Sequence, residues 1–197
     1  MIGVRFLALG DSYTAGEGLS PGQSWPDQLA GRLEGLGKPL AELRVIAKTG
    51  WTTEELEEAI DRAELLPAWD RVSLLIGVND QYRGVPSEEF GGRFERVLEK
   101  AIALAGGRSI RTLVLSIPDW GVTPFAADRN GEEIAAAIDL FNGIIESRAA
   151  ARGCRYLDVT DSSRKAASDP KLIAPDGLHL SEACYAIWIE TIVAELE

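Results

Sequence analysis

Residues 4–13, VRFLALGDSY, decide how the rest of the chain is interpreted. The run from Val4 to Leu9 is apolar and β-rich apart from Arg5, and Gly-Asp-Ser follows it directly. Such a run, closed by glycine, predicts a buried strand that ends in a tight turn. Ser12 would then project from the carboxyl end of that strand, where a polar side chain can meet a ligand.

Similar runs recur along the chain. Apolar, β-rich segments bounded by Gly, Pro, Asp or charged residues predict four further strands, at Arg44–Ala47, Val72–Ile76, Thr112–Ile117 and Arg155–Val159. Apolar residues at helical spacing lie between and after them, at 25–36, 56–63, 90–101, 134–145 and 185–196. Thr52 with Glu55, and Asn130 with Glu133, resemble helix-starting capping boxes or near variants.

The alternation of strands and helices predicts an α/β fold. We expect a three-layer α/β/α sandwich around a five-stranded, mostly parallel sheet, similar to flavodoxin. Ligands of such folds bind at the carboxyl ends of the strands. Because Ser12, Gly50 and Asn79 each follow a predicted strand, we expect them at one edge of the sheet.

Length and composition fit one globular unit. The chain has 197 residues, of which 46% are hydrophobic and 26% charged, and no linker or repeat divides it. A chain of this length can bury roughly 70% of its unfolded surface without metals or disulfides. We therefore expect residues 1–197 to form a single domain.

Net charge and cysteine content limit the possible binding partners and the cellular compartment. The net charge of −11 makes the overall field repulsive to nucleic acid and to anionic membrane surfaces. No apolar stretch approaches the roughly 20 residues that a membrane span needs, and no secretion signal is visible. Cys154 and Cys184 lack a Cys-x-x-Cys spacing, which suggests reduced thiols. These features favour a cytoplasmic protein with a small-molecule substrate, without nucleic acid or stable membrane association; the oligomeric state is left open.

Acyl-transfer chemistry is suggested by three side chains. His179 is the one histidine of the chain, and Asp176 lies three residues before it. This spacing lets a carboxylate orient the imidazole, which can then act as the base for a serine nucleophile such as Ser12. A serine after a strand is more often a cap or turn residue, and a lone histidine is more often structural. The Gly-x-Ser-x-Gly elbow of another hydrolase fold is absent.

Two further positions could stabilise an oxyanion. Asn79 follows the most hydrophobic predicted strand, so its amide is a candidate donor, although an Asx turn would also explain it. Gly50 could leave its backbone N–H open to a ligand, or could simply be a turn residue with positive φ.

Four short blocks in order resemble the GDSL, or SGNH, hydrolase family. They are Gly10-Asp11-Ser12-Tyr13, Gly50 within Lys48–Thr53, Gly77-Val78-Asn79-Asp80 and Asp176-Gly177-Leu178-His179. The resemblance implies a serine hydrolase acting on esters, with Ser12, Asp176 and His179 as catalytic residues. It also implies that the N–H groups of Ser12 and Gly50 and the amide of Asn79 hold the oxyanion. Tyr13 and Leu180 depart from the usual leucine and proline, at positions that carry no chemistry.

The implied activity is hydrolysis of small carboxylic esters, short-chain or aryl, or of thioesters through an acyl-enzyme. Tyr13, Trp51, Tyr82 and Trp120 are candidate substrate contacts. The long connection at 118–130 carries Trp120 and Phe125, which could wall a substrate pocket or simply anchor a packed surface loop, and a second long connection lies at 160–176. No cofactor and no metal site are expected. Lysophospholipase and carbohydrate acetylesterase activities stay open, as does an inactive binding protein of the same fold.

Overall fold

Five strands form one parallel sheet in the computed structural model, which describes residues 3–65 and 68–196. The strand order is β2-β1-β3-β4-β5, and all four ladders are parallel. This order is that of flavodoxin-like folds. The strands are β1 (Val4–Gly10), β2 (Leu40–Ala47), β3 (Arg71–Leu75), β4 (Thr112–Leu115) and β5 (Arg155–Leu157). The predicted fold class is confirmed.

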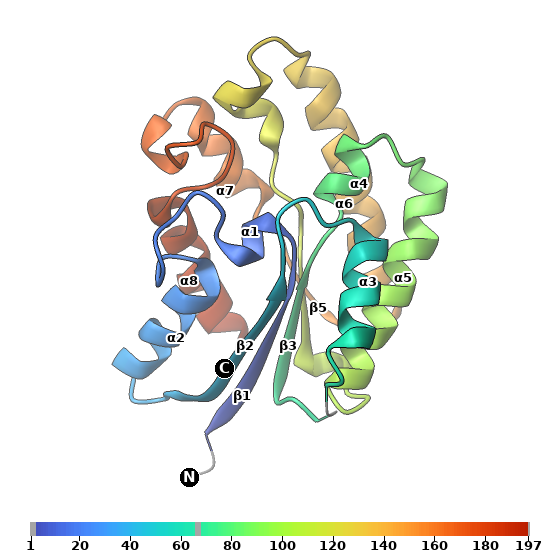
Figure 1. Ribbon diagram of the computed structural model, residues 1–197, viewed down its shortest axis with the longest axis vertical. Helices are drawn as coiled ribbons and strands as arrows, with labels where there is room; N and C mark the ends of the chain where they lie inside the picture. The colour runs from blue at the N-terminus through green and yellow to red at the C-terminus, as the bar shows by residue number, and fades with distance from the viewer. Residues whose placement is uncertain (1–2, 66–67, 197) are drawn as a thin grey trace.

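Helices cover both faces of the sheet (Figure 1). One layer holds α2 (Trp25–Gly35), α7 (Thr160–Arg164) and α8 (Glu182–Leu196). The other holds α3 (Thr53–Arg62), α5 (Ser87–Leu104) and α6 (Gly131–Ala151). None of the helices in the described ranges is both long and apolar enough to cross a bilayer.

The central strands are buried on both faces because helices lie above and below them. Phe6, Leu7 and Leu9 of β1 and Leu74 of β3 are completely inaccessible to solvent. Burial on both faces explains why these strands read as continuous apolar runs rather than as alternating patterns. The sheet is thus a rigid support for the turns at its carboxyl edge.

Helix starts agree with the capping residues in the sequence. Thr52 caps α3 in a complete capping box, in which its side chain accepts from the N–H of Glu55 and Glu55 accepts from the N–H of Thr52. Asn130 caps α6 by accepting from the N–H groups of Glu132 and Glu133. Both predicted helix starts are confirmed.

Some boundaries differ from the predictions. Strand β2 begins four residues before Arg44, at Leu40, because this edge strand is largely exposed and lacks a continuous apolar pattern. Short helices α1 (Ser12–Ala15) and α4 (Val78–Tyr82) begin within three residues of the ends of β1 and β3, where turns were expected. The connections at 118–130 and 160–176 also contain short helical turns, so neither is structureless.

Candidate active site

Three adjacent strands bring the predicted residues to the middle of the sheet edge. Gly10 at the end of β1 lies opposite Ala47 of β2 and Leu75 of β3. Ser12 therefore follows the central strand of the three, while Gly50 and Asn79 follow its two neighbours. A Cβ atom on Gly10 would lie 2.6 Å from the carbonyl oxygen of Leu75, so this close approach of backbones requires glycine.

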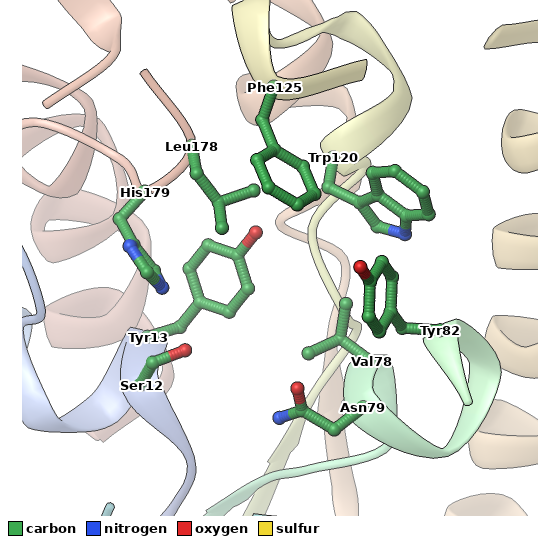
Figure 2. Close-up of a pocket in the computed structure, with 9 residues that line it drawn as sticks. All are labelled: Ser12, Tyr13, Val78, Asn79, Tyr82, Trp120, Phe125, Leu178 and His179. Carbon is green, nitrogen blue, oxygen red and sulfur yellow. The ribbon is translucent and has the colours of Figure 1, made fainter. Parts of the chain in front are cut away.

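Ser12 is the first residue of α1, and the side chain of Asp11 caps this short helix. Asp11 Oδ1 accepts from the N–H of Tyr13 at 3.0 Å. The helix ends after one turn at Gly16, whose φ of +78° is a left-handed conformation that glycine adopts readily. Within the described residues the Ser12 hydroxyl has no hydrogen-bond partner, and it faces a cavity (Figure 2).

A short hairpin before α8 holds Asp176 and His179. An antiparallel bridge between Ile173 and Leu180 closes it, and the N–H of Ala174 donates to the carbonyl of His179 at 2.8 Å. Asp176 Oδ1 accepts from the N–H groups of Leu178 and His179, each at 2.9 Å. These backbone hydrogen bonds fix the orientation of the carboxylate independently of its contact with the imidazole.

The imidazole of His179 is in turn fixed by Asp176. Its Nδ1 atom lies 2.6 Å from Asp176 Oδ2, which leaves Nε2 for another partner. Burial opposes ionisation of Asp176, but the hydrogen bonds from the Leu178 N–H and the His179 ring outweigh it and lower the pKa of this carboxyl group. The ring of His179 lines the same cavity as Ser12 (Figure 2).

Asn79 and the turn at Gly50 are tied together by hydrogen bonds. The side-chain amide of Asn79 donates to the carbonyl of Trp51 at 2.9 Å, which uses one of its two N–H groups. A guanidinium N–H of Arg83 donates to the carbonyl of Gly50 at 2.6 Å, and Arg83 pairs with Glu55 at 3.3 Å. Gly50 has a φ of +84°, which explains the glycine at this position.

A cavity of about 140 Å³ lies between the Ser12 turn, the hairpin that carries His179 and the short helix α4. Ser12 and His179 lie on one side of it, and an aromatic wall of Tyr82, Trp120 and Phe125 lies on the other (Figure 2). Its remaining lining residues are Tyr13, Val78, Asn79 and Leu178. The rings of Tyr13 and His179 pack in a T-shaped arrangement with their centroids 5.5 Å apart. The cavity is therefore largely apolar with polar groups at one end.

The structure brings together most, but not all, of the predicted contacts. Tyr13, Tyr82 and Trp120 line the cavity, whereas Trp51 and Gly50 do not. Trp51 is half-buried against the core, and its carbonyl holds Asn79. Phe125, a candidate pocket wall from the same connection as Trp120, also lines the cavity.

Two buried carboxyl groups lie under the nucleophile turn. Asp11 is fully buried, and its Oδ2 atom has no hydrogen-bond partner in the described part of the chain. Burial, together with the nearby charge of Asp80, raises the pKa of Asp11 to about 7. Asp80 accepts from the N–H and the hydroxyl of Thr53 at 2.9 and 2.7 Å, and burial raises its pKa as well. Sequence reasoning did not single out this pair.

The described residues contain neither a cluster of metal ligands nor a disulfide. Residues 3–65 and 68–196 contain no group of three or more His, Cys, Asp or Glu side chains that could hold a metal ion. Cys154 and Cys184 are both free, and burial raises the pKa of each thiol to about 11.

Comparison with solved structures shows the same architecture. The crystal structure of TesA matches with a TM-score of 0.73 and 22% identity, covering 98% of each chain. The psychrotrophic esterase EstA from Pseudoalteromonas sp., inhibited by monoethylphosphonate, matches with a TM-score of 0.73 and 16% identity over 98% of this chain and 96% of that one. Axe2, an acetylxylan esterase from Geobacillus stearothermophilus, matches with a TM-score of 0.73 and 18% identity, covering 99% of this chain and 95% of that one. These likenesses show the fold.

The family itself is established from the sequence. No curated protein gives a significant match to the chain. The model of the GDSL-like lipase/acylhydrolase family, however, matches residues 8–187 and so spans all four sequence blocks. The chain therefore belongs to the GDSL-like lipase/acylhydrolase family and is a serine hydrolase that acts on ester bonds.

Proposed function

We propose that the protein hydrolyses small carboxylic esters, short-chain or aryl, or thioesters through an acyl-enzyme. In this mechanism Ser12 attacks the carbonyl carbon, and His179 accepts the serine proton and later activates water. Asp176 orients the imidazole and stabilises its charged form. The N–H groups of Ser12 and Gly50 and the amide of Asn79 stabilise the oxyanion.

One observation carries this proposal: Ser12, Asn79 and His179 share one cavity, and Asp176 lies 2.6 Å from His179 Nδ1. The Ser12 hydroxyl and the imidazole are not hydrogen-bonded to each other, but such contacts often tighten only when substrate binds. The Asn79 amide, with one N–H still available, faces the same cavity as the serine, as oxyanion stabilisation requires.

The size of the cavity supports a short acyl group. Its volume of about 140 Å³ is close to the roughly 150 Å³ of an apolar cavity that holds one benzene ring. A lysophospholipid acyl chain is much longer than one ring. The aromatic wall of Tyr82, Trp120 and Phe125 would pack against a short aliphatic or aryl group, burying apolar surface worth about 0.8 kcal/mol per CH₂ group.

Hydrolysis of p-nitrophenyl esters of increasing acyl length tests this proposal. We expect kcat/KM to be highest for chains of a few carbons or a single aryl ring and to fall steeply for long chains, because these exceed the cavity. The control is Ser12→Ala, which should lose turnover with every ester. A rate that keeps rising to long chains would favour the lysophospholipase alternative instead.

A further inference from the structure

Arg129 lies over the aromatic wall of the cavity. The central guanidinium carbon is 5.1 Å from the ring centroid of Tyr82, 5.3 Å from that of Trp120 and 5.8 Å from that of Phe125. One guanidinium N–H also donates to the Tyr82 hydroxyl at 3.2 Å. Contacts of a cation with three ring systems restrict an otherwise flexible side chain. They hold its charge beside the aromatic wall, in a depression that shares Tyr82 and Trp120 with the cavity.

Arg129 keeps most of its hydrogen-bonding capacity free. In the described ranges no carboxylate pairs with it, and the Tyr82 hydroxyl is its one hydrogen-bond partner. Arg83 and Arg164, by contrast, are each paired with a carboxylate. Arg129 is exposed, and a guanidinium carries five N–H donors in a fork that matches a carboxylate. Its unused donors are available to a ligand.

Gln81 adds a second donor on the same side of the wall. Gln81 Oε1 accepts from the Trp120 indole N–H at 2.8 Å, and because an indole only donates, this contact fixes the orientation of the amide. The NH₂ group then has no acceptor among the described residues. Gln81 and Arg129 both line an open depression of about 360 Å³ that shares Tyr82 and Trp120 with the cavity.

Glu133 is the one carboxylate among the residues that line this depression. Its Oε1 atom already accepts from the side chain of Asn130 at 2.8 Å, within the cap of α6. The negative charge of Glu133 would weaken the binding of an anion in this depression. Removing that charge should therefore have the opposite effect from removing Arg129.

We propose that Arg129, assisted by the Gln81 amide, binds a carboxylate at the far end of the acyl chain of the substrate. This inference rests on the proposed function. The substrate would be a half-ester or half-thioester of a short dicarboxylic acid, with its methylene chain against the aromatic wall. A single guanidinium can neutralise a carboxylate, whereas a phosphate dianion would keep excess charge in a protein of net charge −11.

The test compares charged and neutral esters of matched length. The probes are p-nitrophenyl half-esters of succinic, glutaric and adipic acids, each paired with its neutral methyl ester. The measured quantity is the ratio of kcat/KM for the charged ester to that for the neutral ester. Using a ratio removes effects common to both esters, including any change in the catalytic residues.

We expect Arg129→Gln to lower this ratio at least about 10-fold at the best chain length, because a charge-assisted hydrogen bond is lost. The neutral esters should change less than about 3-fold. Arg129→Lys should keep part of the preference, and Glu133→Gln should raise it. The matched control, Arg44→Gln, removes an exposed arginine of edge strand β2 and should leave the ratio unchanged.

An unchanged ratio in Arg129→Gln, or an equal fall in Arg44→Gln, would overturn the inference. An equal fall in kcat/KM for charged and neutral esters would also overturn it, because Arg129 would then only support the aromatic wall. In all these outcomes the wild type still hydrolyses neutral esters in a Ser12-dependent way, so the proposed function survives. A wild type inert toward every ester would overturn both.

Discussion

Asp11 lies directly before Ser12, yet its environment is that of a core residue. The carboxyl group is fully buried, and only Oδ1 is hydrogen-bonded, to the N–H of Tyr13. Burial raises its pKa from 3.8 to about 7, with a smaller contribution from Asp80. Below pH 7 the carboxyl group is mostly protonated, and its Oδ1 atom can still cap α1.

This raised pKa makes a prediction for stability. Between pH 3.8 and about 7 the folded state holds the Asp11 proton and the unfolded state does not. The free energy of unfolding must therefore fall as pH rises through this interval and level off above it. From pH 5 to 8 the loss attributable to Asp11 is about 3 kcal/mol, from roughly 1.36 kcal/mol per pH unit.

Urea unfolding at pH 5 and pH 8 measures this effect. Asp11→Asn cannot ionise and still caps a helix, so it should lose less stability than the wild type over this range. Glu34→Gln, which changes an exposed carboxylate of α2, serves as the control and should behave like the wild type. An Asp11→Asn protein with the wild-type pH dependence would show that Asp11 is ionised when folded.

At the scale of elements, the start of α3 and the end of α4 hold the turn at Gly50. Arg83, at the end of α4, donates to the carbonyl of Gly50 at 2.6 Å and contacts Glu55 of the α3 capping box. Asn79 of α4 holds the next carbonyl, that of Trp51. The two carbonyls are thus fixed from one short helix, which holds the two peptide groups that follow Gly50.

Arg83→Ala should therefore lower kcat more than it changes KM. Loss of this charged hydrogen bond lets the turn move, and we expect a fall of about 10-fold in kcat with little change in melting temperature, since Arg83 is half exposed. Asn79→Ala removes a donor itself and should cost about 10²–10³-fold. Steady-state kinetics with one short ester compares the two variants. A pure KM effect in Arg83→Ala would assign Arg83 to substrate binding instead.

At the scale of the whole molecule, the fold could be predicted from the sequence because the clearest patterns, apolar strands and helix caps, belong to the residues that build the structure. Buried strands such as β1 and β3 must be apolar throughout, and Thr52 must cap α3. Edge strand β2 was placed too late along the chain because an exposed strand is not held to that pattern.

The candidate site was predictable where it depends on the ends of strands. Ser12 and Asn79 follow β1 and β3 directly, so the topology alone places them together. Trp120 and Phe125 were candidates for a pocket wall because they lie in the long connection at 118–130. Arg129, which contacts the same wall, was not a candidate, because no local pattern specifies the path of that connection. Trp51 was misplaced: its side chain packs against the core, and only its carbonyl takes part.

The most direct test of an activated Ser12 is intact-mass spectrometry after treatment with a fluorophosphonate. The account predicts one stoichiometric adduct on the wild type and none on Ser12→Ala, with both proteins folded by circular dichroism. Such an adduct forms only on a serine whose proton is withdrawn by a neighbouring base. A folded wild type without an adduct, or an adduct that persists in Ser12→Ala, would contradict the account.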